Sequence, residues 1–422
     1  MIVGSTPFLN NNTQIHKVET MISDSIYKHI HLHPFCKQII DTPQFQRLRF
    51  LRQLGVASWV YPSATHSRFE HSIGVSHLAN RFIRTLQINQ PELQITETEI
   101  LCVTVAGLCH DLGHGPYSHL FDNEFIRSDK WSHEKGSVNM LKHLVHENNI
   151  QSDPHELQFI YDLILCHSQN QKRRFLYEII NNDRSGLDVD KLDYLVRDAY
   201  MTGVGGISVD VERIIQTARV MPDEHGSLTI CFPVKCVDTI FTIFHARMAM
   251  HTAVYQHKTV KAIEYMIRDI LQLANDYLIF SNLRMSETIH DMNVYQKLND
   301  SVLYLIEQST DPRMKPAQDL LQRLYRRDLY KYCGTIHHHE MMNDFTYEPD
   351  VIVENMIIHH GKGPVLNPLD NIRFFNHKTF EIIPIQYPET LIPKAMGVQY
   401  KRIFVKYARD KERIVEKLSK KF

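Results

Sequence analysis

The sequence lacks the features that direct a chain to a membrane or out of the cell. No run of apolar residues approaches the roughly 18 that a membrane span needs. The first residues lack the basic start and apolar core of a signal peptide. The seven cysteines are odd in number and scattered, mostly among Leu, Ile and Val, which is typical of reduced, packed thiols. We therefore expect a cytoplasmic or nuclear protein that is not secreted and has no membrane partner.

The sequence also lacks an excess of charge. Its net charge is -1 with neutral histidines, so no global positive field attracts nucleic acid or anionic lipid. A site for a polyanion must then be a local pocket, and we expect nucleic acid to be a secondary partner at most. With 422 residues, 43% of them hydrophobic and 23% charged, the chain has an ordinary globular composition and can bury a substantial core.

Composition and periodicity divide the chain into three parts. Residues 1–20 are polar and predict a flexible arm. Helical periodicity dominates residues 21–333, including the stretch 30–54 and the text up to about residue 331. Beyond Gly334, alternating stretches predict strands at 351–353, 372–375, 380–385 and 403–405, and a basic amphipathic helix covers 409–422. The expected fold is mainly α, with a small α+β lobe over residues 334–422.

The segment Cys109–Pro116 places a histidine and an aspartate at the end of a buried helix. Thr96 and Glu99 form a capping box, and the residues that follow are apolar on nearly every side. Glycines and a proline then end the helix just after His110 and Asp111. A histidine at such a position is more often a cap or a hydrogen-bonded core residue, and that alternative remains open for the pair alone.

Further histidines and carboxylates near this pair favour a metal site. They are His66, His71, His114, His119, His133 and Asp122. Imidazoles and carboxylates together suit first-row transition metals, and no cysteine pair has zinc-finger spacing. The three consecutive histidines at 337–339 are expected to be solvated.

Two later helical stretches each carry a polar face. Near residue 188, Asp190, Lys191, Tyr194 and Asp198 share one arc of a helix whose opposite arc is apolar. A solvated face is the ordinary interpretation, but Asp190 is a hard oxygen donor that suits the histidine set. From about 237 to 278 a long helical pattern, broken once, aligns Arg247, His251, Tyr255 and Lys258. A basic and aromatic stripe suits a nucleotide, with a surface face as the alternative.

With these residues in place, the order His71, His110-Asp111, Asp190 is similar to the pattern of the HD superfamily of metal-dependent phosphohydrolases. The motifs more closely resemble the deoxynucleoside triphosphate (dNTP) triphosphohydrolases that carry a SAM domain before their HD domain. They lie at residues 40–55, 66–75, 101–122, 131–137, 187–194 and 255–258. The resemblance runs from about residue 30 to the end and implies a helical HD-domain fold. There is no room for a SAM domain, so we expect the catalytic part alone.

The resemblance implies a role for each matching residue. The metal ligands are His71, His110, Asp111 and Asp190. His119 is the acid near the leaving group, supported by Asp122 and His133. The triphosphate is held by Arg68, His114, Lys191, Tyr194 and Arg247. Gln53 and Asp198 read the sugar 3′-hydroxyl, and Leu54, Tyr255 and Gln256 lie near the base.

The implied reaction attacks the α-phosphorus of a dNTP and gives deoxynucleoside and tripolyphosphate. Such a site needs cations that neutralise the phosphate oxygens and a metal that lowers the pKa of water from roughly 15.7 toward about 7. One iron, manganese or zinc ion is expected in the HD site, and Mg²⁺ with the phosphates. Two alternatives remain: another HD-family nucleotidase or nuclease, and a catalytically silent regulator that binds nucleotide or nucleic acid.

Relatives in this family assemble into oligomers and bind activating nucleotides between subunits. A homo-oligomer, dimer or tetramer, and GTP or a dNTP as activator are therefore expected. The guanine-reading positions match Asp41, Gln46 and Arg49. Other nucleotide-contacting positions match Arg213, Lys235, His257, Lys258, Arg327 and Lys331. However, Thr20, Ser23 and Pro233 stand where the family has lysine, asparagine and arginine, so we expect activation to be altered or absent.

Overall fold

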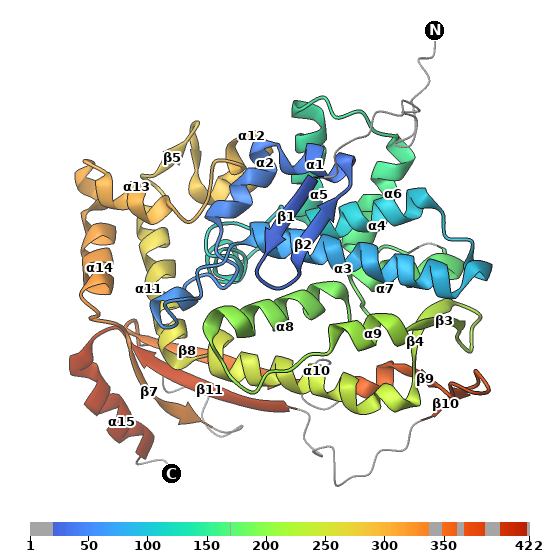
Figure 1. Ribbon diagram of the computed structural model, residues 1–422. Coiled ribbons are helices and arrows are strands. Elements are labelled where there is room, and N and C mark those ends of the chain that lie inside the picture. The colour runs from blue at the N-terminus through green and yellow to red at the C-terminus, as the bar shows by residue number, and fades with distance from the viewer. Residues whose placement is uncertain (1–19, 169, 337–347, 361–366, 385–396, 420–422) are drawn as a thin grey trace.

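The computed structural model describes residues 20–168, 170–336, 348–360, 367–384 and 397–419 (Figure 1). Most of the predicted arm over 1–20 lies outside the described residues. So do the histidines at 337–339, the end of the strand predicted for 380–385 and the last residues of the final helix.

Helices dominate the described chain, as predicted. The helices are α1 (Pro34–Ile40), α2 (Pro43–Gln46), α3 (Arg68–Asn89), α4 (Glu97–Cys109), α5 (His133–Glu147), α6 (Pro154–Leu165), α7 (Arg174–Ile180), α8 (Val189–Thr202), α9 (Val211–Thr217), α10 (Val237–Met250), α11 (Lys258–Ala274), α12 (Met292–Tyr295), α13 (Val302–Gln308), α14 (Lys315–Tyr325) and α15 (Lys411–Ser419). The strands are β1 (Thr20–Asp24), β2 (Lys28–Leu32), β3 (Arg219–Pro222), β4 (Leu228–Pro233), β5 (Ile279–Phe280), β6 (Leu283–Arg284), β7 (Lys331–Ile336), β8 (Val351–His359), β9 (Arg373–Phe375), β10 (Ile382–Ile383) and β11 (Gly397–Val405).

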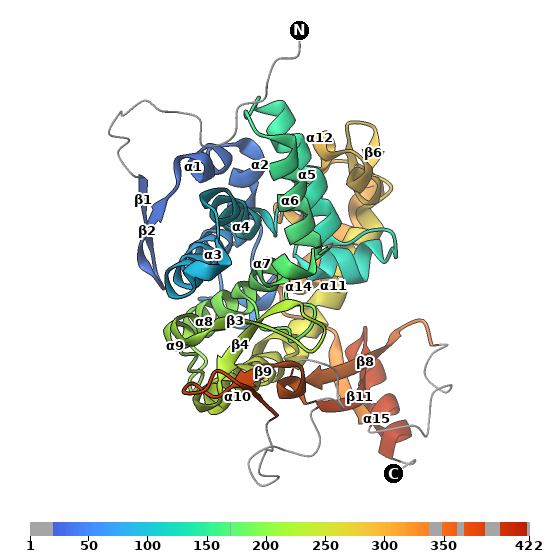
Figure 2. The same cartoon turned by 90° about the vertical axis from the view of Figure 1, so that its right-hand side faces the viewer.

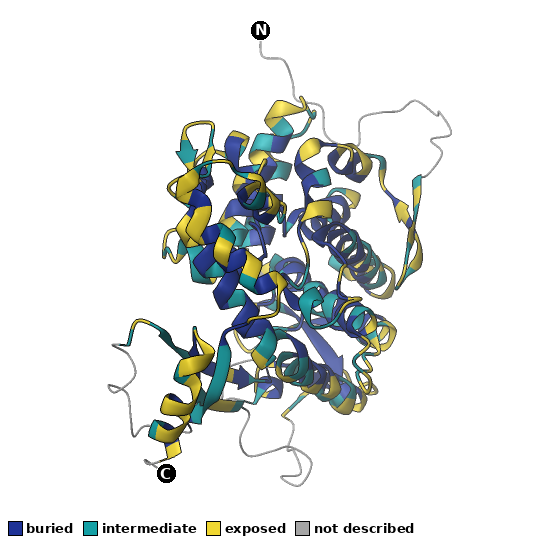
Figure 3. Cartoon of the chain, turned by 90° about the vertical axis from the view of Figure 1, so that its left-hand side faces the viewer, coloured by how far each residue is buried: buried dark blue, intermediate teal, exposed yellow. Residues whose placement is uncertain are grey.

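The centre of the fold is formed by α3, α4 and α8. Helix α4 begins at the predicted capping box of Thr96 and Glu99, and every residue from Ile100 to Cys109 is buried. Helix α3 begins at a second capping box, Ser67 with Glu70, and packs against both α4 and α8. Figure 3 shows the buried residues concentrated in these central helices and the exposed ones on outward faces and along α15. The helices that carry the predicted ligands are therefore rigidly packed.

The predicted break in the helical pattern at 237–278 is present. Helix α10 continues into a π-helical turn over His251–Tyr255, and α11 begins at Lys258. His257 caps α11, because its Nδ1 accepts the Thr259 N–H at 3.2 Å. The break turns the chain while keeping the π-helical turn beside the cavity described below.

Helix was wrongly predicted at the start of the stretch 30–54. Lys28–Leu32 is a strand that pairs antiparallel with β1, and Ile30 and Leu32 alternate as its buried residues. Two short helices, α1 and α2, and a 3-10 helix over Arg47–Phe50 follow. The helix predicted up to about residue 331 was also too long, since α14 ends at Tyr325 and β7 begins at Lys331. Strands β3 and β4 were missed.

The C-terminal region contributes to two sheets. Strands β7, β11 and β8 form an antiparallel sheet in the order β7-β11-β8, which lies at one end of the molecule with α15 (Figures 1 and 2). Ile414 and Leu418 of α15 pack against Ile336, Ile403 and Val405 of this sheet. By contrast, β9 pairs parallel with β4, in a separate sheet ordered β10-β9-β4-β3.

The fold is thus mainly α with a small α+β lobe, as the sequence predicts. β7 runs across the expected boundary between residues 333 and 334. No helix among the described residues is both long and apolar enough to pass through a membrane.

Candidate active site

Four predicted metal ligands converge from three helices. His71 lies in the first turn of α3, and His110 and Asp111 follow the last residue of α4. Asp190 lies in the first turn of α8, whose N-cap is Asp188. Since α3 packs on both other helices, three separate parts of the sequence meet at one point.

The donor atoms of these residues are spaced as ligands of one ion. His71 Nε2 lies 3.0 Å from Asp190 Oδ1 and 3.6 Å from Asp111 Oδ2. His110 Nε2 lies 3.4 Å from Asp111 Oδ1 and 3.5 Å from Asp190 Oδ1. Bonds of about 2.0–2.2 Å to a metal, at tetrahedral or octahedral angles, place neighbouring donor atoms about 3–3.5 Å apart. His71, His110 and Asp190 therefore have the spacing of ligands of one transition-metal ion, and Asp111 lies beside both imidazoles as the predicted fourth ligand.

The hydrogen bonds of the two imidazoles support this fit. His71 Nδ1 is bonded to Asp193 Oδ2 at 2.7 Å, and His110 Nδ1 to the Gly107 carbonyl at 2.8 Å. Each ring thus donates through Nδ1 and turns Nε2 toward the carboxylates, where both Nε2 atoms are buried without a hydrogen-bond partner. Ligating histidines are usually oriented in this way by an acceptor on the other ring nitrogen.

The charges of these residues also favour a bound cation. Burial lowers the pKa of His71, but the nearby carboxylates of Asp190 and Asp193 outweigh this and raise it to about 10. Burial raises the pKa of Asp190, but the adjacent imidazoles of His110 and His71 hold it well below its usual range. The carboxylates therefore stay ionised, and a bound metal ion supplies the positive charge that protonated imidazoles otherwise provide.

A second cluster lies beside the predicted metal ligands. His114, His119, Asp122 and His133 have donor atoms within 4.8 Å of one another. The rings of His114 and His133 stack with centroids 4.1 Å apart, and His119 lies edge-on to both. Asp122 is held by the Trp131 indole N–H at 2.9 Å. The three residues predicted to handle the proton are thus adjacent.

The cluster separates a neutral histidine from a charged one. Burial and the charges of His114 and His133 hold the pKa of His119 well below its usual value. Burial also lowers the pKa of His133, but the hydrogen bond to Asp122 and the charge of Glu134 outweigh this and raise it. The two neighbouring imidazoles are thus shifted in opposite directions, with the proton favoured on His133 over His119.

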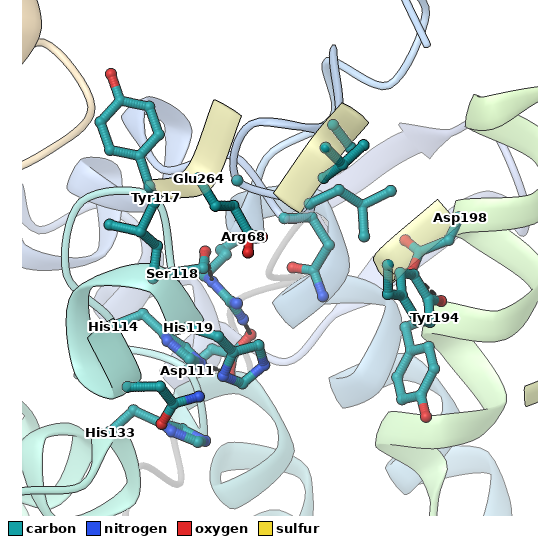
Figure 4. Close-up of a pocket in the computed structure, with 18 of the residues that line it drawn as sticks. Arg68, Asp111, His114, Tyr117, Ser118, His119, His133, Tyr194, Asp198 and Glu264 are labelled. Carbon is teal, nitrogen blue, oxygen red and sulfur yellow. Dashed lines mark hydrogen bonds and ion pairs between the residues drawn. The ribbon is translucent and has the colours of Figure 1, made fainter. Parts of the chain in front are cut away.

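A cavity of about 500 Å³ opens over both clusters. Figure 4 shows His114, His119 and His133 on one side of it and Tyr194 and Asp198 on the other. The predicted substrate residues that line it are Gln53, Leu54, Arg68, His114, Tyr194, Asp198, Arg247, Tyr255 and Gln256. Lys191 does not line it; its ammonium lies 3.6 Å from Asp188. The volume of the cavity suits a nucleotide.

The polar face of α8 is turned toward this wall: Asp198 is buried, and Asp190 and Tyr194, which also line the cavity, are half-buried. Asp198 accepts hydrogen bonds from His66 Nε2 and from the Tyr255 hydroxyl, both at 2.7 Å. Arg247 donates to the carbonyl of His359, a residue of β8, at 2.7 Å. These contacts hold the predicted sugar- and phosphate-binding groups in place before any ligand arrives.

Comparison with known proteins agrees with this geometry. Residues 68–198 match the HD domain, and residues 209–355 match the HD-associated region. Deoxynucleoside triphosphate triphosphohydrolase SAMHD1 of Homo sapiens is 42% identical over 359 residues, which cover 78% of this chain and 57% of the relative. The SAMHD1 of Bos taurus is 36% identical, with 93% of this chain and 76% of the relative covered. The SAMHD1 homolog of Dictyostelium discoideum is 35% identical, with 92% and 77% covered.

The chain belongs to this HD-domain family of deoxynucleoside triphosphate triphosphohydrolases. The resemblance inferred from the motifs is thereby confirmed. The chain spans a little over half the length of the human member of the family, 57%.

The residues predicted to bind an activating nucleotide lie in separate groups at the surface. Asp41 pairs with Lys37, and Gln46 accepts from Arg49 at 2.7 Å. Arg213 donates to the Lys235 carbonyl at 3.1 Å. A third group comprises His257, Lys258, Arg327 and Lys331: Lys258 lies over the Tyr332 ring, and Arg327 donates to the Trp59 carbonyl. Of the described residues in these groups, none lines the cavity.

The carboxylate behind the predicted metal ligands was not predicted from the sequence. Asp193 is fully buried and joins His71 to Arg197, whose Nε lies 2.8 Å from Asp193 Oδ2. The signal was present, because Asp193 lies one helical turn from Asp190 on α8. The cavity wall also includes Lys261 and Glu264 of α11, which pair at 2.5 Å and were not predicted.

Proposed function

We propose that this chain is a metal-dependent dNTP triphosphohydrolase that cleaves its substrate to deoxynucleoside and tripolyphosphate. One observation carries the proposal: the Nε2 atoms of His71 and His110 each lie 3.0–3.6 Å from carboxylate oxygens of both Asp111 and Asp190, beside a cavity of nucleotide size. Membership of the family gives the reaction, since its named members are deoxynucleoside triphosphate triphosphohydrolases.

The cavity walls carry positively charged side chains that neutralise the triphosphate. Arg68 and Arg247 line the same cavity as His114 and Tyr194. Fixed cations and hydrogen-bond donors neutralise the phosphate oxygens without reorganising during the reaction. Lys191, just behind the wall, adds its charge to that of Arg247.

Iron, manganese and zinc all suit a set of two imidazoles and two carboxylates. When bound, such an ion lowers the pKa of water and polarises a phosphoryl oxygen. His71, His110, Asp111 and Asp190 hold the ion, while Asp193 fixes the orientation of the His71 ring. Mg²⁺ accompanies the nucleotide phosphates.

His119 delivers a proton to the leaving oxygen. In the free protein its pKa is depressed, first by burial and then by neighbouring cationic histidines. A bound triphosphate brings negative charge to the same cluster and raises that pKa. His133, whose pKa is raised by the hydrogen bond to Asp122, lies edge-on to His119 and is the adjacent source of the proton. Bound substrate thus favours the protonated form of His119.

Asp198 and Gln53 read the sugar. Asp198 is already fixed by His66 and Tyr255, so it presents its remaining lone pairs at a set angle to a 3′-hydroxyl. Leu54, Tyr255 and Gln256 lie where the base binds.

The surface groups that contain Asp41, Arg213 and Lys258 bind an activating GTP or dNTP between subunits of a homo-oligomer. Thr20 in β1, Ser23 in the same strand and Pro233 at the end of β4 weaken this activation relative to the family. The core over residues 21–333 carries the chemistry, and the lobe over 334–422 supports it. The seven free cysteines suit the cytoplasm or the nucleus.

One experiment separates this proposal from its alternatives. Metal-loaded protein is incubated with each dNTP, with and without GTP, and with single-stranded nucleic acid, and the products are resolved. Tripolyphosphate supports the proposal, and its release only with GTP establishes activation. Phosphate or pyrophosphate indicates another nucleotidase, and shortened nucleic acid indicates a nuclease. Nucleotide binding without any product indicates a silent regulator.

A further inference from the structure

Two irregular segments carry side chains that the proposed reaction needs. Residues 52–55 include Gln53 and Leu54, and residues 117–119 include His119. Residues 52–55, Tyr117 and Ser118 lie outside the helices and named strands, and His119 begins the helical turn that continues into the π-helix Phe121–Ile126. Tyr117 and Ser118 both adopt the left-handed conformation, with φ of 61° and 58°, which side-chain-bearing residues rarely do. Such segments keep their shape only when the surrounding structure holds them.

A single carboxylate joins the two segments. Asp300 Oδ2 accepts the Arg52 N–H at 2.8 Å, and Oδ1 of the same group accepts the Tyr117 N–H at 2.7 Å. The segments also touch directly: a Cβ on Gly55, whose φ is +51°, would come within 2.9 Å of the Tyr117 carbonyl oxygen. Their relative position therefore depends on a close approach that Asp300 fixes.

The hydrogen bonds continue from Asp300 to the metal ligands. Ser118 Oγ donates to the Arg52 carbonyl at 2.8 Å and accepts from Arg68 Nε at 2.8 Å. Arg68 in turn forms an ion pair with Asp111. Figure 4 shows Tyr117, Ser118 and Arg68 on the same side of the cavity. A shift of the Tyr117–Ser118 backbone is thus transmitted to Arg68.

Asp300 is itself firmly anchored. Its N–H donates to the Phe50 carbonyl at 3.1 Å, and its carbonyl accepts the Tyr117 hydroxyl at 2.8 Å. Just before it, Tyr295 donates to the Gly113 carbonyl at 2.8 Å, and the Leu298 carbonyl accepts from Arg47. The segment 295–300 is therefore attached along the loop that follows α4.

We propose that Asp300 is a positioning residue, which aligns the sugar-reading segment 52–55 with the segment that carries Ser118 and His119 and so sets Arg68. Asp300 does not line the cavity and acts only through these neighbours. The inference rests on the proposed function, because that function assigns the roles of Gln53, Arg68 and His119.

The test compares Asp300→Asn with Glu178→Gln. An asparagine accepts only one of the two backbone N–H groups and turns its own NH₂ toward the other. Misplacement of catalytic groups by about 1 Å costs roughly 100-fold, so kcat is expected to fall about 10- to 100-fold. The ratio of kcat/KM for dATP over ATP is expected to fall as well, with the bound metal retained.

Glu178 is a matched control. It is a buried carboxylate that also accepts two hydrogen bonds, from the Thr229 hydroxyl and the Ile230 N–H, both at 2.8 Å, and it does not line the cavity. Glu178→Gln is expected to lower the Tm while leaving kcat and the sugar ratio unchanged.

The proposal is overturned if Asp300→Asn lowers the Tm as Glu178→Gln does but keeps the wild-type kcat and sugar ratio. If the wild type releases no tripolyphosphate, it is the proposed function that fails. The Kd values for dATP and ATP then decide the role of Asp300: a changed ratio in Asp300→Asn supports positioning, and an unchanged ratio overturns it.

Discussion

Replacing Asp193 by asparagine tests how the metal site is oriented. The Asp193 carboxylate accepts from His71 Nδ1 at 2.7 Å and pairs with Arg197 through both of its oxygens, at 2.8 and 2.9 Å. The asparagine side chain has one acceptor oxygen for these three contacts. The hydrogen bond that fixes the tautomer and the orientation of the His71 ring is therefore lost or weakened. Loss of such an outer hydrogen bond typically weakens metal binding about 10- to 100-fold, or about 1.4–2.7 kcal/mol.

The assay is metal content after competition with a graded series of chelator concentrations, read by elemental analysis. Asp24→Asn is the control, because Asp24 also pairs with Arg197, at 2.8 Å, but does not contact His71. Both variants are expected to be less stable than the wild type, while only Asp193→Asn releases metal more easily. Equal metal retention in Asp193→Asn and wild type would refute the reasoning, as would equal loss in both variants.

Three further predictions follow from the site and its surroundings. Replacing His110 and Asp111 together by alanine removes two of four ligands, and we expect neither bound metal nor turnover; retained turnover would falsify the metal site. Asp198→Asn replaces a carboxylate acceptor by an amide. We expect this to lower the discrimination against ribonucleotides about 10- to 100-fold, measured as the kcat/KM ratio of dATP to ATP. The pKa of His77 is lowered to about 4, first by burial and then by the charge of Arg81. Because this is below the value of about 6.5 for an unfolded chain, the folded state is destabilised as pH falls from 6.5 toward 4. The loss of Tm between pH 7.5 and pH 4.5 is expected to be smaller in His77→Phe than in the wild type, and an equal loss in both would contradict this.

The helices that bear the ligands were predictable because their signals are local. The capping box of Thr96 and Glu99 fixes where α4 begins, and the glycines after His110 fix where it ends. The two faces of α8 separate at helical periodicity, which groups Asp190, Tyr194 and Asp198 before any tertiary contact is known. That these residues line one cavity agrees with the grouping.

What could not be predicted depends on contacts between distant segments. Asp193 gains its role only because α3 packs against α8 and brings His71 beside it. Asp300 lies far along the chain from Arg52 and Tyr117, and no periodicity indicates that it meets both. The strand Lys28–Leu32 was missed because its two buried residues, Ile30 and Leu32, are too few to separate alternation from helical spacing.

The parallel pairing of β9 with β4 constrains the order in which the molecule is built. β4 is synthesised 140 residues before β9, and at about 5–20 residues per second this gap lasts about 7–28 seconds. During that time one edge of β4, whose residues from Thr229 to Pro233 are buried in the finished fold, has no neighbour on the β9 side. Nascent chains stalled before residue 373 are therefore expected to expose this unpaired edge of β4 to aggregation and to chaperone capture.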